Sequence, residues 1–279
     1  MNSSAVHVRG LSKSYGQLRA VRDLDLDVNY GEIFAILGPN GAGKSTTIEI
    51  LEGHRKRDLG HVRVLGEDPG TAGRSWRAKI GIVLQEVSDA GMLTVSETVQ
   101  MFAKCYGMAR MPGEVLELVG LGSVSDSKVR KLSGGQRRRL DVALGIINIP
   151  EVVFLDEPTT GFDPEARRRF WDLIRLLADD GTTILLTTHY LDEAAALANR
   201  VAVIADGRVA AIDSPQNLIG HVRSAATVRW KQGGQVHVEE TDYPTELIRQ
   251  RSRDGGELAE LTVSRPTLED AYLQLIGLR

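Results

Sequence analysis

A glycine-rich segment at residues 38–45 has the sequence GPNGAGKS and matches the phosphate-binding pattern G-x-x-x-x-G-K-[S/T]. The apolar stretch EIFAIL precedes it and TTIEILEG follows, which predicts a strand, a loop and a helix. Its three glycines let the backbone turn tightly, so that successive N–H groups converge on phosphate oxygens. Lys44 would bring a positive charge to the β- and γ-phosphates, and the Ser45 hydroxyl would ligate Mg²⁺. A turn without a ligand is the alternative, but the strand–loop–helix context favours a nucleotide site.

Two carboxylates end the apolar run VVFLDE at residues 152–157. In open α/β sheets, ligands bind at the carboxyl ends of the strands, and Asp156 and Glu157 stand at such an end. Asp156 is therefore placed to hold Mg²⁺, and Glu157 to polarise a water for attack on a γ-phosphate. An apolar run that ends in Asp-Glu is a weak signal alone, but it becomes strong downstream of a phosphate loop.

Three further polar residues stand beside predicted strands. His189 follows TTILLTT and Gln85 ends KIGIVLQ, so both belong at the same sheet edge as the carboxylates. The Gln85 amide could reach the metal or the attacking water, whereas a lone histidine is more often structural than catalytic. Tyr15 precedes the first core strand and, taken alone, indicates a packing or turn residue rather than a platform for a base.

A second glycine pair lies in LSGGQRRR, residues 132–139, and looks like another backbone loop built to face phosphate. One ATP already has Lys44, backbone donors and Mg²⁺ around its phosphates, so a second loop in the same pocket would be redundant. The arginine triplets at residues 137–139 and 167–169 are interpreted as solvated helix faces.

The elements that must position these residues alternate between strands and amphipathic helices. Near-continuous runs of Val, Ile and Leu predict strands that are covered on both faces of an α/β sheet. The strand segments are 6–8, 32–37, 61–66, 79–85, 151–156, 182–188 and 200–206. The best-marked helix has Asp163 as its N-cap, Pro164 as its first residue and Gly181 at its end. Asp206-Gly207 lies between two apolar segments and predicts a hairpin.

Two regions differ from this alternation. The stretch after residue 87 is helical in pattern, and we interpret it as a helical subdomain inserted at about 87–140. After residue 222, TVRW and QVHVEE flank a Gly-Gly turn, and a helix, a strand and a final amphipathic helix follow, which is enough for a small α+β unit. We therefore expect a main domain at residues 1–221 and an accessory domain at residues 222–279.

Composition limits the classes of function. The 34 Lys and Arg against 37 Asp and Glu give a net charge of −3, which provides no basic field for nucleic acid. Cys105 is the only cysteine, so no intrachain disulfide can form and a cytosolic location is favoured. The N-terminal segment lacks the apolar core of a signal peptide, and no apolar run approaches about 18 residues. We expect any work at a membrane to need a partner.

The order and types of these motifs resemble the nucleotide-binding subunit of ATP-binding-cassette (ABC) transporters over roughly residues 5–220. The resemblance implies an α/β P-loop NTPase fold of the ABC type with an inserted helical subdomain, and it implies ATP hydrolysis with Mg²⁺. It also implies a head-to-tail dimer, with an identical copy or a paralogue, that encloses two shared ATP molecules. LSGGQ would then contact the γ-phosphate bound by the other subunit, so the two glycine-rich loops of one chain would serve two different ATP molecules.

The resemblance carries roles to individual residues. Nucleotide contacts are implied for Tyr15, which would stack on adenine, and for Gly38, Pro39, Asn40, Gly41, Ala42, Gly43, Lys44, Ser45, Thr46, Gln85, Ser133, Gly134, Gly135, Gln136 and Asp163. Metal contacts are implied for Ser45, Gln85 and Asp156, and catalytic roles for Glu157 and the switch histidine His189. Asp163 belongs to GFDP, a loop similar to one that contacts the opposite subunit, although Phe162 stands where leucine is usual.

Three longer segments, which begin TTIEILEGH, THYLDEAAA and RPTLEDAYL, resemble ATPase subunits of drug and antibiotic exporters. Separate transmembrane permease subunits are then implied as partners, with this chain peripheral at the cytoplasmic face of the membrane and no nucleic acid bound. The cargo stays open, because related subunits export polysaccharides, peptides and other substrates.

Two other classes of function are weighed against this one. Soluble ABC proteins of translation or DNA maintenance typically carry two cassettes in one chain or long coiled-coil insertions, and neither is present here. An interaction module that binds nucleotide without turnover is the other class, and the presence of both Glu157 and His189 weighs against it.

Overall fold

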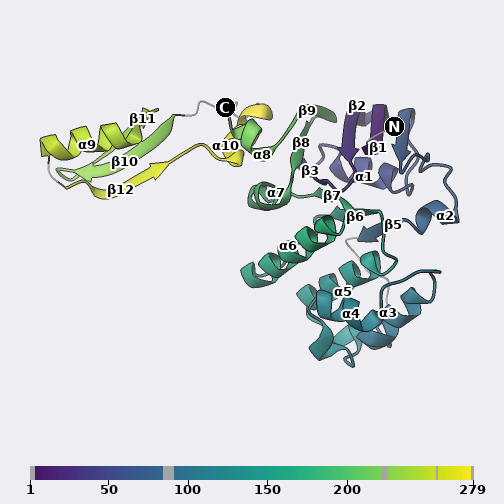
Figure 1. The fold of residues 1–279 in the computed structure, drawn as a ribbon. Coiled ribbons are helices and arrows are strands. Elements are labelled where there is room, and N and C mark those ends of the chain that lie inside the picture. Colours follow the sequence, from purple (N-terminus) through teal and green to yellow (C-terminus); the bar gives the residue numbers. More distant parts are fainter. Residues whose placement is uncertain (1–3, 84–90, 221–224, 256, 278–279) are drawn as a thin grey trace. The chain divides into compact units, whose positions relative to one another are not determined.

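The phosphate loop is held by a six-stranded sheet whose strands come from distant parts of the sequence. The structure is a computed structural model that describes residues 4–83, 91–220, 225–255 and 257–277 (Figure 1). The sheet order is β5-β6-β7-β3-β8-β9, and its four pairings from β5 to β8 are parallel. These strands are β3 (Ile33–Leu37), β5 (Ile80–Val83), β6 (Val152–Asp156), β7 (Thr183–Thr187), β8 (Arg200–Ala205) and β9 (Arg208–Asp213). The near-continuous burial of β3, β6, β7 and β8 explains the continuous apolar runs of their sequences, whereas β9 at the sheet edge is partly exposed.

A second sheet, antiparallel and three-stranded, consists of β1 (Ser4–Tyr15), β2 (Leu18–Asn29) and β4 (Leu59–Val64) in the order β2-β1-β4. The sequence predicts only residues 6–8 and 61–66 of this sheet. The prediction misses β2 and most of β1, because bulges interrupt the alternation in β1 and because every second residue of the central part of β2 is an aspartate. One apolar core joins both sheets and α1 (Lys44–Leu51), and it includes Phe34, Ile48 and Trp76.

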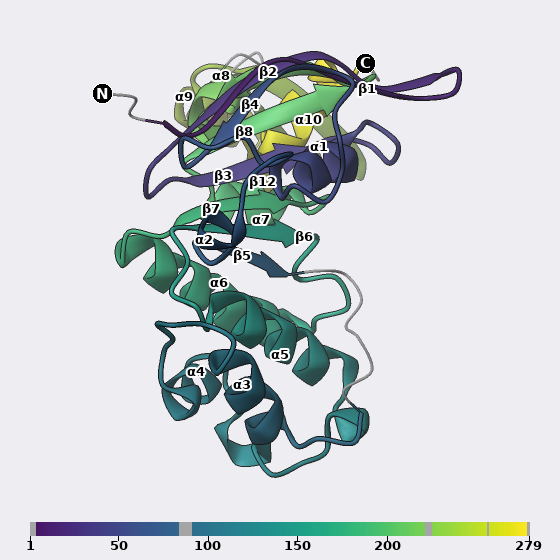
Figure 2. The same ribbon diagram turned by 90° about the vertical axis from the view of Figure 1, so that its right-hand side faces the viewer.

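Helices surround the six-stranded sheet and form the expected helical insertion. Helices α3 (Val95–Ala103), α4 (Pro112–Leu118) and α5 (Gly134–Ile146) lie together beside β5 (Figure 2). Short turns of 3-10 helix, Gly122–Val124 and Val129–Lys131, connect α4 to α5. The remaining helices are α2 (Arg74–Arg77), α6 (Pro164–Asp179) and α7 (Leu191–Leu197). The prediction of a helix capped by Asp163 is confirmed, since the Asp163 carboxylate accepts a hydrogen bond from the Ala166 N–H.

The chain divides into two compact units, Met1–Ile212 and Asp213–Arg279, whereas the sequence led us to expect the boundary after residue 221. The difference arises because α8 (Pro215–Gly220) packs on α10 (Leu268–Leu275) and therefore belongs to the second unit. That unit also contains β10 (Ala226–Gln232), β11 (Gln235–Thr241), α9 (Pro244–Gly255) and β12 (Ala259–Ser264), with the sheet order β11-β10-β12. Among the described residues, no helix has both the length and the apolar character of a membrane span.

Candidate active site

The phosphate loop follows β3, and close packing against neighbouring strands requires two of its glycines. A Cβ atom on Gly38 would lie 2.3 Å from the Ile204 carbonyl oxygen of β8. A Cβ atom on Gly43 would lie 2.3 Å from the Ala20 carbonyl oxygen of β2, and Gly43 also has φ of 100°. Gly41 has open space around it but a φ of 81°, so its backbone conformation alone favours glycine. The loop shape is thus set by both sheets.

Lys44 is buried at the start of α1 and holds the loop from inside. Its Nζ donates hydrogen bonds to the carbonyl oxygens of Gly38, at 2.8 Å, and Pro39, at 3.2 Å. Burial lowers the pKa of this ammonium group, and the negative charges of Glu157 and Asp156 oppose that shift. Because an ammonium group has three N–H donors, one donor remains for a phosphate oxygen.

A pocket of about 320 Å³ brings the phosphate loop together with residues from elsewhere in the chain. The lining residues are Tyr15, Leu18, Ala20, Asn40, Gly41, Gly43, Lys44, Ser45, Thr46 and Glu157. Tyr15 ends β1, next to the turn into β2, and the sequence alone could not show that this hairpin reaches the phosphate loop. Arg55 lies over the Tyr15 ring, with the guanidinium carbon 5.3 Å from the ring centre. Of the loop residues expected to contact nucleotide, Gly38, Pro39 and Ala42 belong to the loop but do not line this pocket.

Asp156 and Glu157 stand where β6 ends, and the neighbouring strand β7 holds both. The Thr187 hydroxyl donates a hydrogen bond to Asp156 Oδ1. The Glu157 N–H donates to the Thr187 carbonyl and hydroxyl oxygens, each at 3.1 Å. Glu157 has φ of 45°, a left-handed conformation that is uncommon for residues other than glycine. Such a backbone persists only when surrounding contacts hold it, and it is often found at active sites.

The two residues that the sequence marks as catalytic contact each other. His189 Nδ1 lies 3.3 Å from Glu157 Oε2, and the Thr160 hydroxyl lies 3.4 Å from the same oxygen. The His189 ring packs on Tyr190, with ring centres 4.0 Å apart. A carboxylate beside the phosphate pocket, in contact with an imidazole, can orient and deprotonate a water molecule.

LSGGQ starts α5 and presents its glycines outward. The Ser133 hydroxyl accepts a hydrogen bond from the Gln136 N–H at 3.2 Å, and the Gln136 side chain accepts one from the Ser133 N–H at 3.0 Å. This reciprocal capping fixes the first turn of the helix. Ser133 and Gly134 are exposed, and a Cβ atom on either glycine would meet no neighbour. Among the described residues that line the phosphate pocket, none belongs to this segment.

Arg138 is the main residue that the sequence interpretation missed. The interpretation of residues 137–139 as a solvated helix face is wrong for Arg138, which is buried. Its guanidinium donates to the carbonyl oxygens of Asp156, at 2.7 Å, and Pro158, at 3.1 Å. The spacing contained a signal, because a residue four positions before the core residue Val142 shares its helix face. Arg138 therefore links the LSGGQ helix to the backbone that carries Asp156 and Glu157 in the same chain.

Arg139 is also held by the protein, since its Nη1 donates to the Gly120 carbonyl oxygen at 2.8 Å. In the second triplet, by contrast, Arg168 and Arg169 are exposed, as the sequence predicts. Phe162, in the loop before α6, is buried and packs edge-on against Phe170, with ring centres 5.9 Å apart. Asp163 is exposed and lies outside the phosphate pocket.

The expected Mg²⁺ site can be tested in part. Gln85 lies outside the described residues. Ser45 lines the pocket, and Asp156 stands at the same sheet edge with one oxygen bound to Thr187. Among the described residues, no group of three or more His, Cys, Asp or Glu is arranged so that it could hold a metal ion by itself. This donor set fits Mg²⁺, which is usually held by one or two protein oxygens together with water and substrate phosphates.

Comparisons with known proteins point to one family. The ABC transporter family pattern matches residues 21–160. The chain is 38% identical to the daunorubicin resistance ATP-binding protein DrrA2 of Streptomyces coeruleorubidus, over 100% of this chain and 97% of the relative. It is 37% identical to the Nod factor export ATP-binding protein I of a Rhizobium species, over 99% of this chain and 98% of the relative.

Solved structures agree with these sequence matches. A dimeric ATP-binding cassette in a post-hydrolysis state, bound to ADP and Pi, superposes with a TM-score of 0.68 at 27% identity. The superposition covers 75% of this chain and 98% of the cassette. The ATP-binding subunit of another transporter gives a TM-score of 0.71 at 25% identity, over 78% of this chain and 93% of that subunit.

Proposed function

This chain belongs to the ABC transporter family, and from that premise we propose that it powers export of a drug, antibiotic or other small molecule through separate membrane subunits. Its reaction is the hydrolysis of ATP to ADP and phosphate. Full-length similarity to ATP-binding proteins named for daunorubicin resistance and Nod factor export supports the direction of transport. The membrane subunits would determine which compound is transported, because the transported compound crosses the membrane through them.

Each residue of the site has a physical task in this proposal. Lys44 places a positive charge beside the phosphates, and loop N–H groups bind the phosphate oxygens. Ser45 and Asp156, with Gln85, would hold Mg²⁺, which when bound neutralises phosphate charge. Glu157 would orient the attacking water and accept its proton. His189, whose Nδ1 lies 3.3 Å from Glu157 Oε2, would hold that carboxylate and contact the γ-phosphate.

A second copy of the chain, or a paralogue, completes each site. Ser133, Gly134, Gly135 and Gln136 lie outside the pocket of their own chain, and the exposed start of α5 offers N–H donors to a phosphate bound elsewhere. The dimeric cassettes among similar structures support this arrangement. Asp163, exposed at the start of α6, would contact the opposite subunit. Tyr15, which lines the phosphate pocket, would stack on adenine.

In this proposal the chain binds the membrane subunits and is therefore a peripheral protein at the cytoplasmic face of the membrane. ATP binding would draw two chains together and hydrolysis would release them, which shifts the membrane subunits between inward-facing and outward-facing states.

The contact between Glu157 and His189 beside the phosphate pocket carries the catalytic part of this proposal. Glu157→Gln keeps the shape of the side chain but removes the base, so turnover should fall by about 100-fold or more while ATP still drives dimer formation. Glu151→Gln is the matched control, because Glu151 stands at the opposite end of β6 and is half-exposed. ATPase assays with gel filtration in ATP measure both properties.

Equal turnover in the wild type and the Glu157→Gln variant would contradict the catalytic proposal and favour a module that only binds nucleotide. Purification of the chain from membranes tests the transport proposal separately, and it should recover a polytopic membrane protein. Recovery of ribosomes or DNA instead would favour the alternative function in translation or DNA maintenance.

A further inference from the structure

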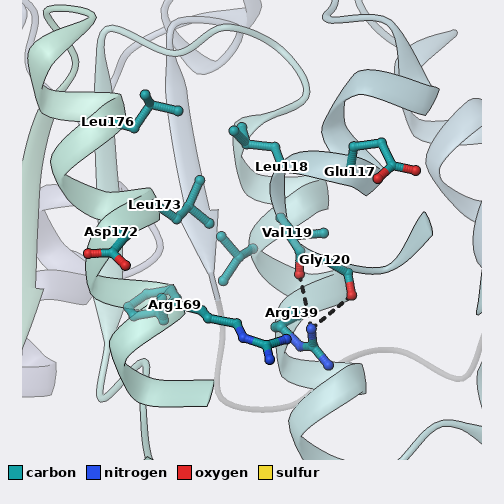
Figure 3. Close-up of a pocket in the computed structure, with 11 residues that line it drawn as sticks. Glu117, Leu118, Val119, Gly120, Arg139, Arg169, Asp172, Leu173 and Leu176 are labelled. Atoms are coloured by element: carbon teal, nitrogen blue, oxygen red, sulfur yellow. Dashed lines mark hydrogen bonds between the residues drawn. The ribbon is translucent and has the colours of Figure 1, made fainter. Parts of the chain in front are cut away.

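A pocket of about 390 Å³ opens between α4, α5 and α6, away from the phosphate loop (Figure 3). Its wall is mainly apolar, and the apolar residues are Leu118, Val119, Val142, Phe170, Leu173 and Leu176. Leu176 is 45% exposed, so the apolar wall can be reached from solvent. The volume falls in the range of about 300 to 1,000 Å³ that is typical of small-molecule sites.

Two arginines give one end of this pocket a positive charge. Arg139 and Arg169 extend toward each other beside the apolar wall (Figure 3). Hydrogen bonds from Arg139 Nη1 to the Val119 and Gly120 carbonyl oxygens, at 3.3 and 2.8 Å, hold its guanidinium in place. Arg139 Nε is buried and has no hydrogen-bond partner. Burial and the nearby charge of Arg169 both lower the pKa of Arg139, and the charge of Asp163 opposes that shift only in part. An anion here would therefore relieve an unfavourable pair of like charges.

The nearby carboxylates leave the charge of Arg139 only partly balanced. Asp163 attracts Arg139, but one of its oxygens caps α6 by accepting from the Ala166 N–H. Asp172 accepts a hydrogen bond from Arg175 at 2.9 Å, on the exposed side of α6. Glu117 points away from Leu173 and Leu176, toward Gly122 (Figure 3). Glu165 pairs with Arg169, but both side chains are largely exposed, and such pairs are worth little in water.

We propose that this pocket binds a small amphipathic anion, with an apolar body against Leu118, Leu173 and Leu176 and its acidic group on Arg139 and Arg169. An apolar wall with a few polar groups at one end is the usual design of a site that orients such a ligand. Charge-assisted hydrogen bonds from two guanidinium groups would select a carboxylate or sulfonate over a neutral compound.

Packed side chains also connect the pocket to the ATP site, and this part of the inference rests on the proposed function. Phe170 forms part of the wall, and its ring packs against Phe162 in the loop that leads to Asp163. Arg139 lies on the same helix that begins with the LSGGQ turn. A ligand that fixes α4, α5 and α6 together should therefore change the affinity of two chains for each other in ATP, and by linkage ATP should change the affinity for the ligand.

Titration calorimetry on the full chain without nucleotide tests the site directly. The probes are 4-phenylbutyrate and decanoate, and the uncharged comparison is 4-phenylbutyramide. We expect at least one anion to bind saturably with one site per chain, and the amide to bind about tenfold more weakly or less. Arg139→Met should weaken anion binding by about 10- to 100-fold. Leu176→Trp should abolish it, because the larger side chain fills the pocket from its exposed side.

Arg168→Met is the matched control, since Arg168 is exposed on α6 and does not line the pocket, and it should bind the anions as the wild type does. The absence of saturable binding for both anions would overturn the proposal. So would binding that Arg139→Met and Leu176→Trp leave unchanged. Because these titrations contain no ATP, their failure is distinct from a failure of the proposed ATPase function.

The connection to the ATP site is tested by the same titration on the Glu157→Gln variant with ATP present. We expect the dissociation constant of the anion to shift by about fivefold or more when ATP is added. An unchanged constant in a chain that demonstrably forms the ATP dimer would overturn the coupling.

Discussion

At the scale of single residues, Thr187 binds directly to both carboxylate residues at the end of β6, Asp156 and Glu157. Its hydroxyl donates to Asp156, and its carbonyl and hydroxyl oxygens accept from the Glu157 N–H. Thr187 is fully buried, so its own donor and acceptor atoms are shielded from water. The left-handed backbone of Glu157 therefore depends on the neighbouring strand.

Replacement of Thr187 tests this dependence. Thr187→Val removes the hydroxyl, so Asp156 Oδ1 loses a buried donor and the free energy of unfolding should fall by about 1 to 3 kcal/mol. We also expect kcat to fall by roughly tenfold, because Glu157 is then less firmly placed. Thr187→Ser keeps the hydroxyl and is the control. Urea unfolding and steady-state ATPase assays measure the two effects, and a valine variant within twofold of wild-type turnover would contradict this role.

Arg138 acts through the backbone of the carboxylate strand and not on the nucleotide. Arg138→Met leaves the Asp156 and Pro158 carbonyl oxygens without their donor, and kcat should fall by about 10- to 100-fold while KM for ATP changes little. Arg137→Met is the matched control, because Arg137 is the exposed neighbour on the same helix. A rise in KM without a loss of kcat would mean that Arg138 serves nucleotide binding instead.

At the scale of elements, the sequence predicts best where one physical cause dominates. β3, β6, β7 and β8 are buried on both faces, so their apolar runs are unmistakable and their bounds lie within a residue or two of those predicted. The sequence does not predict β2, because its aspartates resemble those of a solvated loop. They in fact serve the sheet, since Asp25 accepts a hydrogen bond from the Gly10 N–H and Asp27 binds Arg9. The alternation of Leu24, Leu26 and Val28 with these aspartates is the strand signal.

Some parts of the candidate site could be predicted from the sequence and others could not, for the same reason. The phosphate loop and the carboxylate pair are local patterns, and the sequence predicts them directly. The burial of Arg138 and the approach of Tyr15 to the phosphate loop depend on which faces of α5 and β1 meet distant strands. Sequence periodicity indicates which face of each element is buried, but it does not show which distant element that face contacts.

Helix α1 ends in a buried carboxyl group with a consequence for pH. Burial, with the charges of Asp156 and Glu49, raises the pKa of Glu52 from 4.5 to about 8. The folded chain then keeps a proton that the unfolded chain loses, so the Glu52 contribution to stability falls by about 1.4 kcal/mol per unit as pH rises between these values. The 3.3 Å contact of Glu52 with His54 Nδ1 is compatible with a protonated carboxyl, which can donate to the imidazole.

Glu52→Gln should remove this pH dependence. Between about pH 5.5 and about pH 7.5, the wild type should lose roughly 2 to 3 kcal/mol of unfolding free energy relative to the variant. Urea unfolding at the two pH values measures the difference, with Glu151→Gln as an exposed control. Parallel pH profiles for the wild type and Glu52→Gln would show that Glu52 is ionised in the folded chain.

At the scale of the whole molecule, each unit has a tryptophan at the centre of its own core. Trp230 packs with Val228 and Leu258 in the C-terminal unit, and Trp76 lies in the core of the N-terminal unit. Small units bury a smaller fraction of their surface, so we expect the C-terminal unit to unfold more easily than the N-terminal unit.

Hydrogen exchange should separate the two units. Trp230→Ala removes a fully buried ring, at a cost of roughly 3 to 5 kcal/mol, so protection should disappear from β10, β11 and β12 and remain in β3, β6 and β7. Trp76→Ala should give the opposite pattern. Loss of protection throughout the chain in the Trp230→Ala variant would show that the units unfold as one.

The position of β3 in the centre of its sheet has a consequence for biosynthesis. Both hydrogen-bonding neighbours of this early strand, β7 and β8, are among the last parts of the unit to be translated. A ribosome that adds about 5 to 20 residues per second needs on the order of 10 to 30 s to pass from the phosphate loop to the end of β8. During this interval the apolar strand β3 lacks both of its neighbours, and Gly38 lacks the Ile204 carbonyl oxygen against which it packs. The nucleotide site can therefore take its folded shape only after β8 has been made.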